Sequence, residues 1–482
     1  MHQRRFALLL LGCALASAPR PAGASAQGAA GADVRARGAP AGARLVEPPV
    51  LANVSAWPGV VEVHLVAAPA TLPYGPGQGT RVLAFNGSVP GPTLEAREGD
   101  RVVVHFKNEL DEPTTIHWHG LHIPFESDGS PFHPVQPGER HDYVFTIPEG
   151  TAGTYWYHPH PHHRTTHQVS HGLFGALIGR AADDPLAGIP EKLLVLADNR
   201  FRADGSIDVP EKGSMQARFD EENGREGDVL FVNSQVLPAI DIRPGEAQRW
   251  RIVNASAARV YRLGLTGATM LHVGSDGGLF ERPVEVDELV VSNSERVEVI
   301  VRGTGAPGTS AALQALPYDR YIPQTRPADW DRPRDLVTLR YGGQPLATPV
   351  ALPPTLRPVA PLDPDVATAT RVAVLTQGMI NNRKMDMRRV DVSAPLGATE
   401  VWQIENLVGM DHPFHLHGFR FQVIDRNGEP VPFRSWKDTV NVPKHETVRI
   451  IVRYDDFPGK WMFHCHILNH EDMGMMGVLE VR

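Results

Sequence analysis

The residues with the clearest chemical potential lie near the carboxyl end of the chain, in HCHILNHEDMGMM at positions 464–476. This stretch holds three histidines, one cysteine and three methionines within thirteen positions. The chain has two cysteines, Cys13 and Cys465, and Cys13 lies in an amino-terminal segment that we expect to be removed. Cys465 would then be the single thiol of the mature protein, which excludes an internal disulfide. Imidazole, thiolate and thioether groups are ligands of soft metal ions, so the stretch predicts metal chemistry.

A blue-copper electron-transfer centre needs one thiolate, two imidazoles and a weak axial ligand such as methionine. Cys465 can supply the sulfur, and His470, five residues later, can return to the same metal ion. Met475 can reach the axial position. His412 is the candidate for the second imidazole, because it lies outside the His-x-His pair of HPFHLHG at 412–418. A structural zinc ion would use more cysteines or a closed four-ligand set.

Four His-x-His pairs form a second pattern, in two matched sets. HWHG (117–120) and YHPH (157–160) make one set, and HPFHLHG (412–418) and FHCH (463–466) make the other. Residues i and i+2 of a strand point to the same face, so each pair presents two imidazoles side by side. Cys465 then points to the face opposite its two histidine neighbours, which links two metal sites through one residue. The eight histidines are His117, His119, His158, His160, His415, His417, His464 and His466.

The elements that must position these side chains are strands of a repeated unit. Segments 84–110, 231–256 and 379–407 each begin with an asparagine in a turn, pass a glycine, and continue as an apolar-alternating run that ends on asparagine. Such alternation is typical of half-buried strands, and frequent turn residues, including 43 prolines, favour β-sandwiches over helices. Three copies predict three related all-β domains.

We place these domains at 45–180, 191–342 and 366–482, with linkers at 181–190 and in the proline-rich stretch 342–365. A length of 482 residues fits about three domains of ~150 residues each. The histidine pairs occur in the first and third domains. The corresponding stretch of the second domain holds only His272, so we expect this domain to bind no copper and to act as a spacer.

The amino-terminal segment predicts export. Arg4 and Arg5 precede the apolar run FALLLLGCALA at 6–16, and two Ala-Ser-Ala sites follow, which is the layout of a signal peptide over 1–26. The arginine pair leaves twin-arginine export open, and LLGC at 10–13 leaves a lipoprotein site open. We expect a flexible linker at 27–44 and a periplasmic or secreted protein without a transmembrane segment. A net charge of −8 gives no indication of a nucleic-acid partner.

HWHG, HPHP, HPFHLHG and HCHILNHEDMGMM resemble the four copper-binding motifs of the multicopper oxidases, the laccase-like group, in the family's order and over nearly the whole mature chain. The resemblance implies three cupredoxin-like Greek-key β-barrel or sandwich domains and four coppers per chain. It implies that one type 1 copper is bound by His412, Cys465, His470 and Met475, and one type 2 copper by His117 and His415. It also implies that two type 3 coppers are bound by His119, His158, His160, His417, His464 and His466.

The activity that this resemblance implies is one-electron oxidation of phenols, aromatic amines or metal ions, coupled to four-electron reduction of O2 to water. Four coppers can collect four electrons before oxygen is committed. A periplasmic cuprous oxidase for copper detoxification is an alternative. A non-catalytic cupredoxin scaffold is an alternative of another class, but such proteins lose ligands that this chain keeps. A copper-containing nitrite reductase would have two domains per chain. We expect a monomer.

Two acids resemble residues that deliver protons in bacterial members of the family, Asp128 and Glu471. We assign them to catalysis together with Cys465, with a loop cap and a solvated side chain as the structural alternatives. Surplus histidines could bind further copper, although a solvated loop or hydrogen bonds to the ligands are favoured. These histidines are His162, His163, His167 and His171.

Substrate contact is expected beside the type 1 ligands. Met410 and Asp411 precede His412, and Glu471 and Asp472 follow His470, so these side chains are expected to crowd the entrance. Acids would favour cationic or proton-releasing donors, and Met410 would favour Cu(I). Because the chain has no long methionine-rich insert, we expect an entrance that is open to bulky phenols and aromatic amines.

Overall fold

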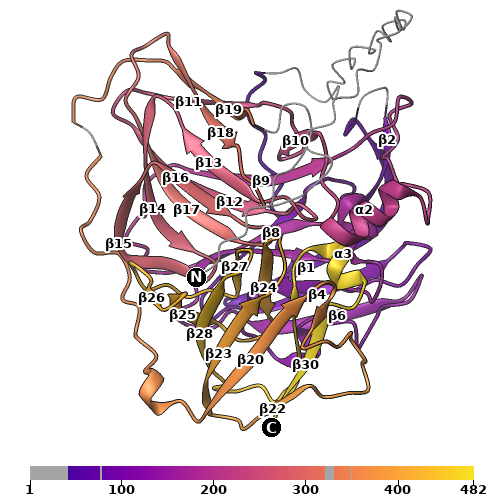
Figure 1. Ribbon diagram of the computed structural model, residues 1–482. Coiled ribbons are helices and arrows are strands. Elements are labelled where there is room, and N and C mark those ends of the chain that lie inside the picture. The colour runs from indigo at the N-terminus through magenta and orange to yellow at the C-terminus, as the bar shows by residue number, and fades with distance from the viewer. Residues whose placement is uncertain (1–41, 76–78, 321–330, 349) are drawn as a thin grey trace, which may run out of the picture. The chain divides into compact units, whose positions relative to one another are not determined.

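The computed structural model describes residues 42–75, 79–320, 331–348 and 350–482. Across these residues the chain folds into three successive β-sandwiches, drawn from indigo through magenta to yellow in Figure 1. The expected signal peptide and most of the expected linker lie outside the described residues. Residues 42–44 of that linker are held by the second sandwich, because Gly42 donates its N–H to the Leu237 carbonyl at 2.9 Å and Arg44 forms a β-bridge with Ala239. No helix in the described ranges is long and apolar enough to cross a membrane.

The first sandwich consists of two four-stranded sheets, with strand orders β2-β1-β4-β6 and β3-β8-β7-β5. Its elements are β1 Val60–Leu72, β2 Thr80–Phe85, β3 Gly91–Arg97, β4 Arg101–Asn108, β5 His117–His119, η1 Phe125–Ser127, β6 Arg140–Thr146, β7 Gly153–His158, α1 Thr165–Ser170 and β8 Gly175–Arg180.

The second sandwich has a six-stranded sheet, β10-β9-β12-β17-β14-β15, and a five-stranded sheet, β11-β19-β18-β13-β16. Its elements are β9 Glu191–Asn199, α2 Met215–Asn223, β10 Val229–Val232, β11 Ala239–Ile242, β12 Ala247–Asn254, β13 Tyr261–Leu265, β14 Ala268–Ser275, β15 Gly278–Val286, β16 Glu288–Val291, β17 Arg296–Gly303, β18 Ser310–Leu316 and β19 Arg334–Tyr341.

The third sandwich also has six- and five-stranded sheets, β21-β20-β23-β28-β25-β26 and β22-β30-β29-β24-β27. Its elements are η2 Pro364–Val366, β20 Ala369–Thr376, β21 Met379–Ile380, β22 Val392–Ala394, β23 Thr399–Asn406, β24 His412–Leu416, β25 Phe421–Arg426, β26 Glu429–Pro430, β27 Thr439–Val442, β28 Thr447–Arg453, β29 Gly459–Cys465, α3 Leu468–Asp472 and β30 Met476–Val481.

The same pairing pattern recurs in all three sandwiches. One sheet of each contains a parallel pair followed by an antiparallel neighbour: β1 with β4 and β6, β9 with β12 and β17, and β20 with β23 and β28. The other sheet of each contains a second parallel pair, formed by β3 and β8, β11 and β19, or β22 and β30. The prediction of three related cupredoxin-like β-domains is therefore confirmed.

The repeated asparagines explain why one sequence unit recurs. Asn86, Asn233 and Asn381 all have positive φ, between 49° and 52°, a region that asparagine tolerates better than most residues. The side-chain oxygen of each accepts the backbone N–H of a valine in the first strand of its sandwich, at 2.7–2.8 Å. The side-chain amide of each donates to a carbonyl two residues earlier in the same strand. Each asparagine thus fixes a turn against the strand that begins its domain.

Alternating apolar side chains give each sandwich its own core. In β4, for example, Val102, Val104 and Phe106 are buried, whereas the residues between them are partly exposed. Trp118, Trp250 and Trp402 are buried at the centres of the first, second and third cores. The described residues nevertheless form a single unit, since buried polar contacts join the three cores.

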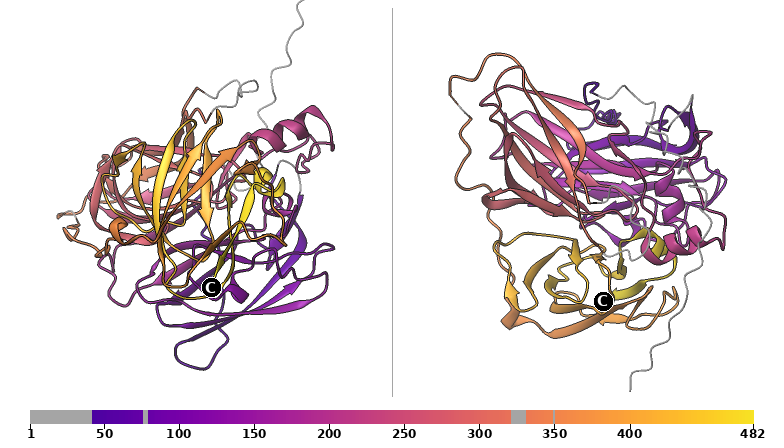
Figure 2. Two further views of the ribbon diagram at one scale, coloured as in Figure 1. Left: turned by 60° about the horizontal axis from the view of Figure 1, so that its bottom comes forward. Right: turned by 45° about the horizontal axis from the view of Figure 1, so that its top comes forward.

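Four strands or strand ends bring the histidine pairs together. β5 pairs antiparallel with β7 and sets His117 opposite His158. β24 pairs antiparallel with β29 and sets His415 opposite His464. The yellow and orange strands of the third sandwich lie alongside the indigo and purple strands of the first (Figure 2). The two pairs of strands therefore face one another across the boundary between the first and third sandwiches.

Candidate metal centre

Two groups of ligating side chains lie on opposite faces of β29. Cys465 belongs to a buried group with His412 and His470, in which the ligating atoms lie within 4.8 Å of one another. His464 belongs to a different buried group, with His160 and His417. The alternation of side chains along the strand thus separates Cys465 from its neighbours, as the sequence predicts.

The group around Cys465 is compact. Its Sγ atom lies 3.6 Å from His470 Nδ1, and the His412 and His470 rings are 5.1 Å apart and nearly perpendicular. Neither ring nitrogen of the buried His412 has a hydrogen-bond partner among the described residues. A buried imidazole without partners costs free energy, so these nitrogens fit a metal ligand better than a packing residue.

Met475 completes the loop around this group. Its side chain is buried, its backbone N–H donates to the His470 carbonyl at 2.9 Å, and its carbonyl accepts the Cys465 N–H at 3.2 Å. Burial raises the pKa of the Cys465 thiol to about 12. A thiolate at neutral pH therefore requires a bound cation, which is what a coordinating metal ion provides.

The eight paired histidines form a second buried cluster. Most of them turn one ring nitrogen outward to an oxygen acceptor, and the other inward. Five histidines donate from Nδ1 in this way, to Asp128, Pro159, Asp438 or Cys465 oxygens at 2.8–3.1 Å. These histidines are His117, His158, His415, His417 and His464.

The inward nitrogens face one another at short range. His417 Nε2 and His464 Nε2 are 3.0 Å apart, and His160 Nε2 lies 3.3 Å from the same His464 atom. His117 Nε2 and His415 Nε2 are 3.4 Å apart. Because the outward nitrogens carry the protons, the inward ones present lone pairs, and lone pairs at this separation repel unless a cation lies between them. The donor set therefore fits a cluster of metal ions.

The six type 3 candidates divide into two triads. His160, His417 and His464 converge in one of the buried groups. The second triad is His119, His158 and His466. The His466 ring lies 4.9 Å from the His119 ring and 5.4 Å from the His158 ring, and neither of its nitrogens has a hydrogen-bond partner among the described residues. Two triads suit two metal ions side by side.

The protonation of these imidazoles suits metal binding. Burial, followed by repulsion from neighbouring histidines, lowers the pKa of His158, His160 and His415 well below the usual range. The pKa of His412 falls for the same reasons, in the other group. Neutral imidazole is the form that binds metal ions.

The two candidate acids lie beside the cluster but differ in their protonation. Asp128 is buried, and its Oδ2 accepts from His417 Nδ1 at 2.9 Å while its carbonyl accepts from His117 Nδ1. Burial favours a high pKa for Asp128, but the charges of His417 and His117 outweigh it and lower the pKa below the usual range. Asp128 is thus an ionised hydrogen-bond acceptor.

Glu471 has the opposite character. Its two carboxyl oxygens lie 3.4 Å from His160 Nδ1 and 3.5 Å from His464 Nδ1, and the side chain is buried. Burial, assisted by the neighbouring Asp472, raises the pKa of Glu471 well above its usual range. A carboxyl group with a raised pKa keeps its proton to a higher pH and can donate it, so the environments of Asp128 and Glu471 suit them to different roles.

The expected crowd of acids at an entrance is not present. Glu471 faces the histidine cluster, and the Asp472 carboxylate accepts the backbone N–H groups of Thr165 and Thr166 at 2.9 Å. Asp411 is buried, and its carboxylate accepts from the Tyr318 hydroxyl and from Asn441 at 2.9 Å. Asp472 and Asp411 point inward because backbone and side-chain donors satisfy them there, whereas both Glu471 carboxyl oxygens are buried without a hydrogen-bond partner among the described residues.

The expected open entrance is also not what the described residues show. His470 is buried, and its Nε2 donates to the Glu222 carbonyl at 3.0 Å, at the end of helix α2. Gly224, with φ of +80°, brings this turn so close that an added Cβ would lie 2.5 Å from Ala258 and 2.6 Å from Ile467. A segment of the second sandwich thus covers the candidate type 1 ligand group. The contact joins residues 248 positions apart, so no local sequence pattern predicts it.

The surplus histidines do not converge. None of them belongs to a group of three ligating atoms within the described chain. His163 Nδ1 contacts the Asp472 carbonyl at 2.6 Å, and His171 Nδ1 contacts the His167 carbonyl at 2.7 Å. Hydrogen bonding therefore accounts for His163 and His171, while His167 lies in helix α1 and the buried His162 Nδ1 has no hydrogen-bond partner among the described residues.

Sequence reasoning missed two residues that contact the cluster, Asp438 and Thr439, and a third, Arg296, that contacts Asp438. Asp438 Oδ1 accepts from His119 Nε2 at 2.9 Å, and the Asp438 carbonyl accepts from His415 Nδ1. Arg296, in the second sandwich, forms an ion pair with the same carboxylate. The second domain is therefore more than a spacer.

Comparison with known proteins identifies the class of this fold and site. Family models described as multicopper oxidase match residues 69–183, 187–344 and 358–482. The Staphylococcus haemolyticus protein named multicopper oxidase mco is 31% identical over 414 residues, which cover 83% of this chain and 84% of that protein. A Bacillus stratosphericus laccase is 30% identical over 471 residues, covering 83% of this chain and 91% of the laccase.

Among solved structures, the Campylobacter jejuni multicopper oxidase, described as a metallo-oxidase, superposes with a TM-score of 0.84 at 34% identity, covering 93% of this chain and 98% of that one. The chain belongs to the multicopper oxidase family. It is a laccase-like, copper-dependent oxidoreductase that couples oxidation of a reducing substrate to reduction of O2.

Proposed function

We propose that this chain binds four coppers. His412, Cys465, His470 and Met475 hold the type 1 copper. His117 and His415 hold the type 2 copper, and the two triads of histidines hold the type 3 pair. When bound, these ions supply one-electron transfer at the thiolate site and four-electron reduction of O2 at the histidine cluster.

One observation carries this proposal: Cys465 belongs to one ligand group while the residue before it, His464, belongs to the other. Two redox sites on opposite faces of one strand are then connected through a few covalent bonds. A structural metal site does not need a covalent path to a second site. An oxidase that accepts electrons at one metal site and reduces O2 at the other does need such a path.

Proton supply follows from the contrast between the two acids. We assign Glu471, protonated and in contact with His160 and His464, to proton delivery at the cluster. We assign Asp128, ionised and hydrogen-bonded to His417, to holding the imidazoles and their charge.

We propose that electrons enter through the covered edge of His470. The Glu222 carbonyl that accepts the His470 N–H belongs to an exposed residue, so a donor on the surface of α2 is separated from the imidazole by one residue and one hydrogen bond. Outer-sphere donors such as phenols and aromatic amines can use this route without entering a pocket. This favours the laccase-type activity.

A metal-ion oxidase, including a cuprous oxidase, is the second candidate. The Campylobacter jejuni multicopper oxidase that this chain resembles is described as a metallo-oxidase, which favours this candidate. Met410 and Asp411 remain the proposed contacts for Cu(I), although Met410 is only 8% exposed and Asp411 is satisfied by internal donors. A non-catalytic scaffold is disfavoured, since every proposed ligand is present and buried.

Export and a monomeric state complete the proposal. The order of charged, apolar and small residues in the first 26 positions supports a signal peptide and a periplasmic or secreted location. A single free, buried cysteine among the described residues is compatible with an oxidising compartment, since it cannot form disulfides at the surface.

Oxygen uptake with defined donors tests the substrate class. The copper-loaded enzyme would be given a dimethoxyphenol or Cu(I), each with and without added Cu(II), under identical conditions. Turnover of the phenol without added Cu(II) supports the laccase-type activity. Phenol turnover that depends wholly on added Cu(II), together with rapid Cu(I) oxidation, would replace it with the cuprous oxidase.

A further inference from the structure

His119 differs from the other ligands in the nitrogen that it turns outward. Five of the other paired histidines donate from Nδ1 to a backbone or carboxylate oxygen and keep Nε2 inward. His119 instead directs Nε2 to Asp438 Oδ1 at 2.9 Å and to Thr439 Oγ1 at 3.2 Å. Its Nδ1 faces inward, 3.4 Å from His158 Nε2. The ring is therefore reversed relative to its partners.

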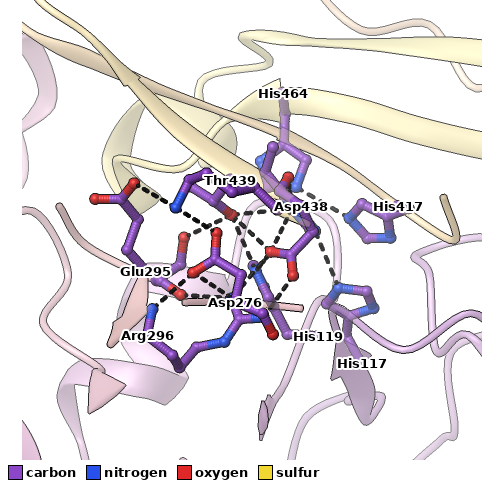
Figure 3. A network of polar contacts seen from close by, with 12 residues as sticks. His117, His119, Asp276, Glu295, Arg296, His417, Asp438, Thr439 and His464 are labelled. Carbon is purple, nitrogen blue, oxygen red and sulfur yellow. Dashed lines mark hydrogen bonds and ion pairs between the residues drawn. The ribbon is translucent and has the colours of Figure 1, made fainter. Parts of the chain in front are cut away.

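This reversal requires a defined acceptor. Histidine binds a metal ion through whichever nitrogen lacks a proton, and the hydrogen bond made by the other nitrogen fixes that choice. If Nε2 lost its acceptor, the proton could move to Nδ1 and remove the inward lone pair. Asp438 supplies the acceptor, as Figure 3 shows for the labelled His119 and Asp438.

Arg296 fixes Asp438 from the second sandwich. Its guanidinium donates to both carboxylate oxygens of Asp438, at 2.9 Å for the Nη1–Oδ1 contact. Its remaining contacts are the carbonyls of Thr154 at 3.2 Å, Ser294 at 2.9 Å and Asp276 at 3.2 Å. All five N–H groups of this buried arginine therefore have acceptors.

These acceptors come from all three sandwiches. Thr154 lies in β7 of the first, Ser294 and Asp276 lie in the second, and Asp438 immediately precedes β27 of the third. Lys437 extends the network by pairing with Asp276 at 2.9 Å and Glu295 at 3.1 Å. A bidentate arginine held at five points cannot shift without breaking contacts in every domain.

Gly120 provides independent evidence that the position of this pair is critical. It directly follows His119 in HWHG and has φ of +90°. A Cβ added at this residue would overlap the Arg296 guanidinium and the Asp438 carboxylate. The glycine of the motif thus leaves the space that the ion pair occupies against the backbone of the histidine it orients.

We infer that Asp438 is a positioning residue for His119, and that Arg296 holds it in place, so that the second sandwich fixes the ring orientation of one ligand of the copper cluster. The inference rests on the proposed copper assignment. It gives the domain without copper ligands a specific role, since its arginine determines how a ligand of the first domain is presented.

The test compares Asp438→Asn and Arg296→Lys with Asp425→Asn. Asp425 is a suitable control because it is a buried carboxylate in the same sandwich, paired with Arg449 at 2.7 Å, and none of its hydrogen bonds is to a histidine. For each copper-loaded protein we would measure copper per chain, the intensity of the blue thiolate band, and the rate of copper release to a chelator.

Asp438→Asn is expected to release copper from the cluster 10- to 100-fold faster than wild type, the usual effect of losing a partner of a ligating histidine, while the blue band persists. Arg296→Lys, which keeps the charge but not the fork of donors, should shift the release rate in the same direction. Asp425→Asn should release copper at the wild-type rate.

Copper release from Asp438→Asn and Arg296→Lys within about twofold of wild type would overturn the inference, as would loss of the blue band in parallel with cluster copper. If Asp438→Asn does not fold, the Arg296→Lys result decides alone. A wild-type protein that binds no copper would instead refute the copper assignment itself, so the two failures are distinguishable.

Discussion

The Sγ atom of Cys465 lies 3.6 Å from Nδ1 of His470, on the face of β29 opposite the imidazole of its neighbour His464. This relationship makes one strand the connection between two ligand groups. Electrons that arrive at the thiolate need to cross only the backbone next to Cys465 to reach the histidine cluster.

The role of Glu471 predicts a pH dependence. Because burial raises its pKa, Glu471 keeps its proton to a higher pH than an exposed carboxyl group and loses it as the pH rises through the raised value, so oxygen reduction should fall on the alkaline side. Glu471→Gln should slow reoxidation of the reduced enzyme by about 100-fold or more and abolish this alkaline limb. Rapid-mixing measurements of reoxidation across pH check the slower rate and the loss of the alkaline limb. If the alkaline limb is unchanged in the variant, another group causes it.

Asp128→Asn should also slow oxygen reduction, through loss of a charged hydrogen-bond acceptor rather than of a proton donor. The variant loses the charged acceptor of His417 but no contact to Cys465 or His470. We expect slower oxygen reduction with nearly normal reduction of the blue band by substrate. Single-turnover traces separate these steps, and slowed reduction with normal reoxidation would contradict the assignment.

The cover over His470 can be loosened at Gly224. Gly224→Ala would force the turn after α2 away from Ala258 and Ile467, and the positive φ adds a strain of about 1–3 kcal/mol. We expect slower reduction of the blue band by a phenol in this variant, because moving the turn separates the Glu222 carbonyl from His470 Nε2 and interrupts the proposed electron route. Gly213→Ala is the matched control, since Gly213 has φ of +81° but nothing near its Cβ. Equal rates in the two variants would show that electrons do not enter by this route.

Met410→Leu separates the two candidate activities. Met410 is buried in the third core, and leucine of similar volume should cost less than about 1.5 kcal/mol. If the methionine serves packing, oxidation of Cu(I) and of a phenol should both stay within about twofold of wild type. A selective loss of Cu(I) oxidation, measured by oxygen uptake, would favour the metal-ion oxidase.

The sequence predicted that these histidines and Cys465 gather in two groups, because the grouping follows strand periodicity. A His-x-His pair in a strand places two imidazoles on one face of the sheet, whatever the strand packs against. The repeated Asn and Gly positions indicate three similar sandwiches. Both features are local, so no knowledge of packing was needed to infer them.

The residues that sequence reasoning missed are joined by contacts between distant segments. Arg296 and Asp438 are 142 positions apart, and His470 and Glu222 are 248 apart. Neither pair has a spacing that a strand or helix would impose. The expected open entrance failed for this reason, since helix α2 reaches the type 1 candidate from another domain. Only Gly120 of the HWHG motif reflects the Arg296–Asp438 pair. It is a glycine because a side chain at this position would overlap the pair.

Copper content and the visible spectrum of wild type and Cys465→Ser test the central claim most directly. The account predicts about four coppers per chain and an intense blue thiolate-to-copper band in wild type. It predicts that Cys465→Ser, still folded, loses the band, one copper and the oxidase activity, and retains the copper of the histidine cluster. A colourless wild-type protein that holds zinc after copper reconstitution, or a blue band that survives in Cys465→Ser, would contradict it.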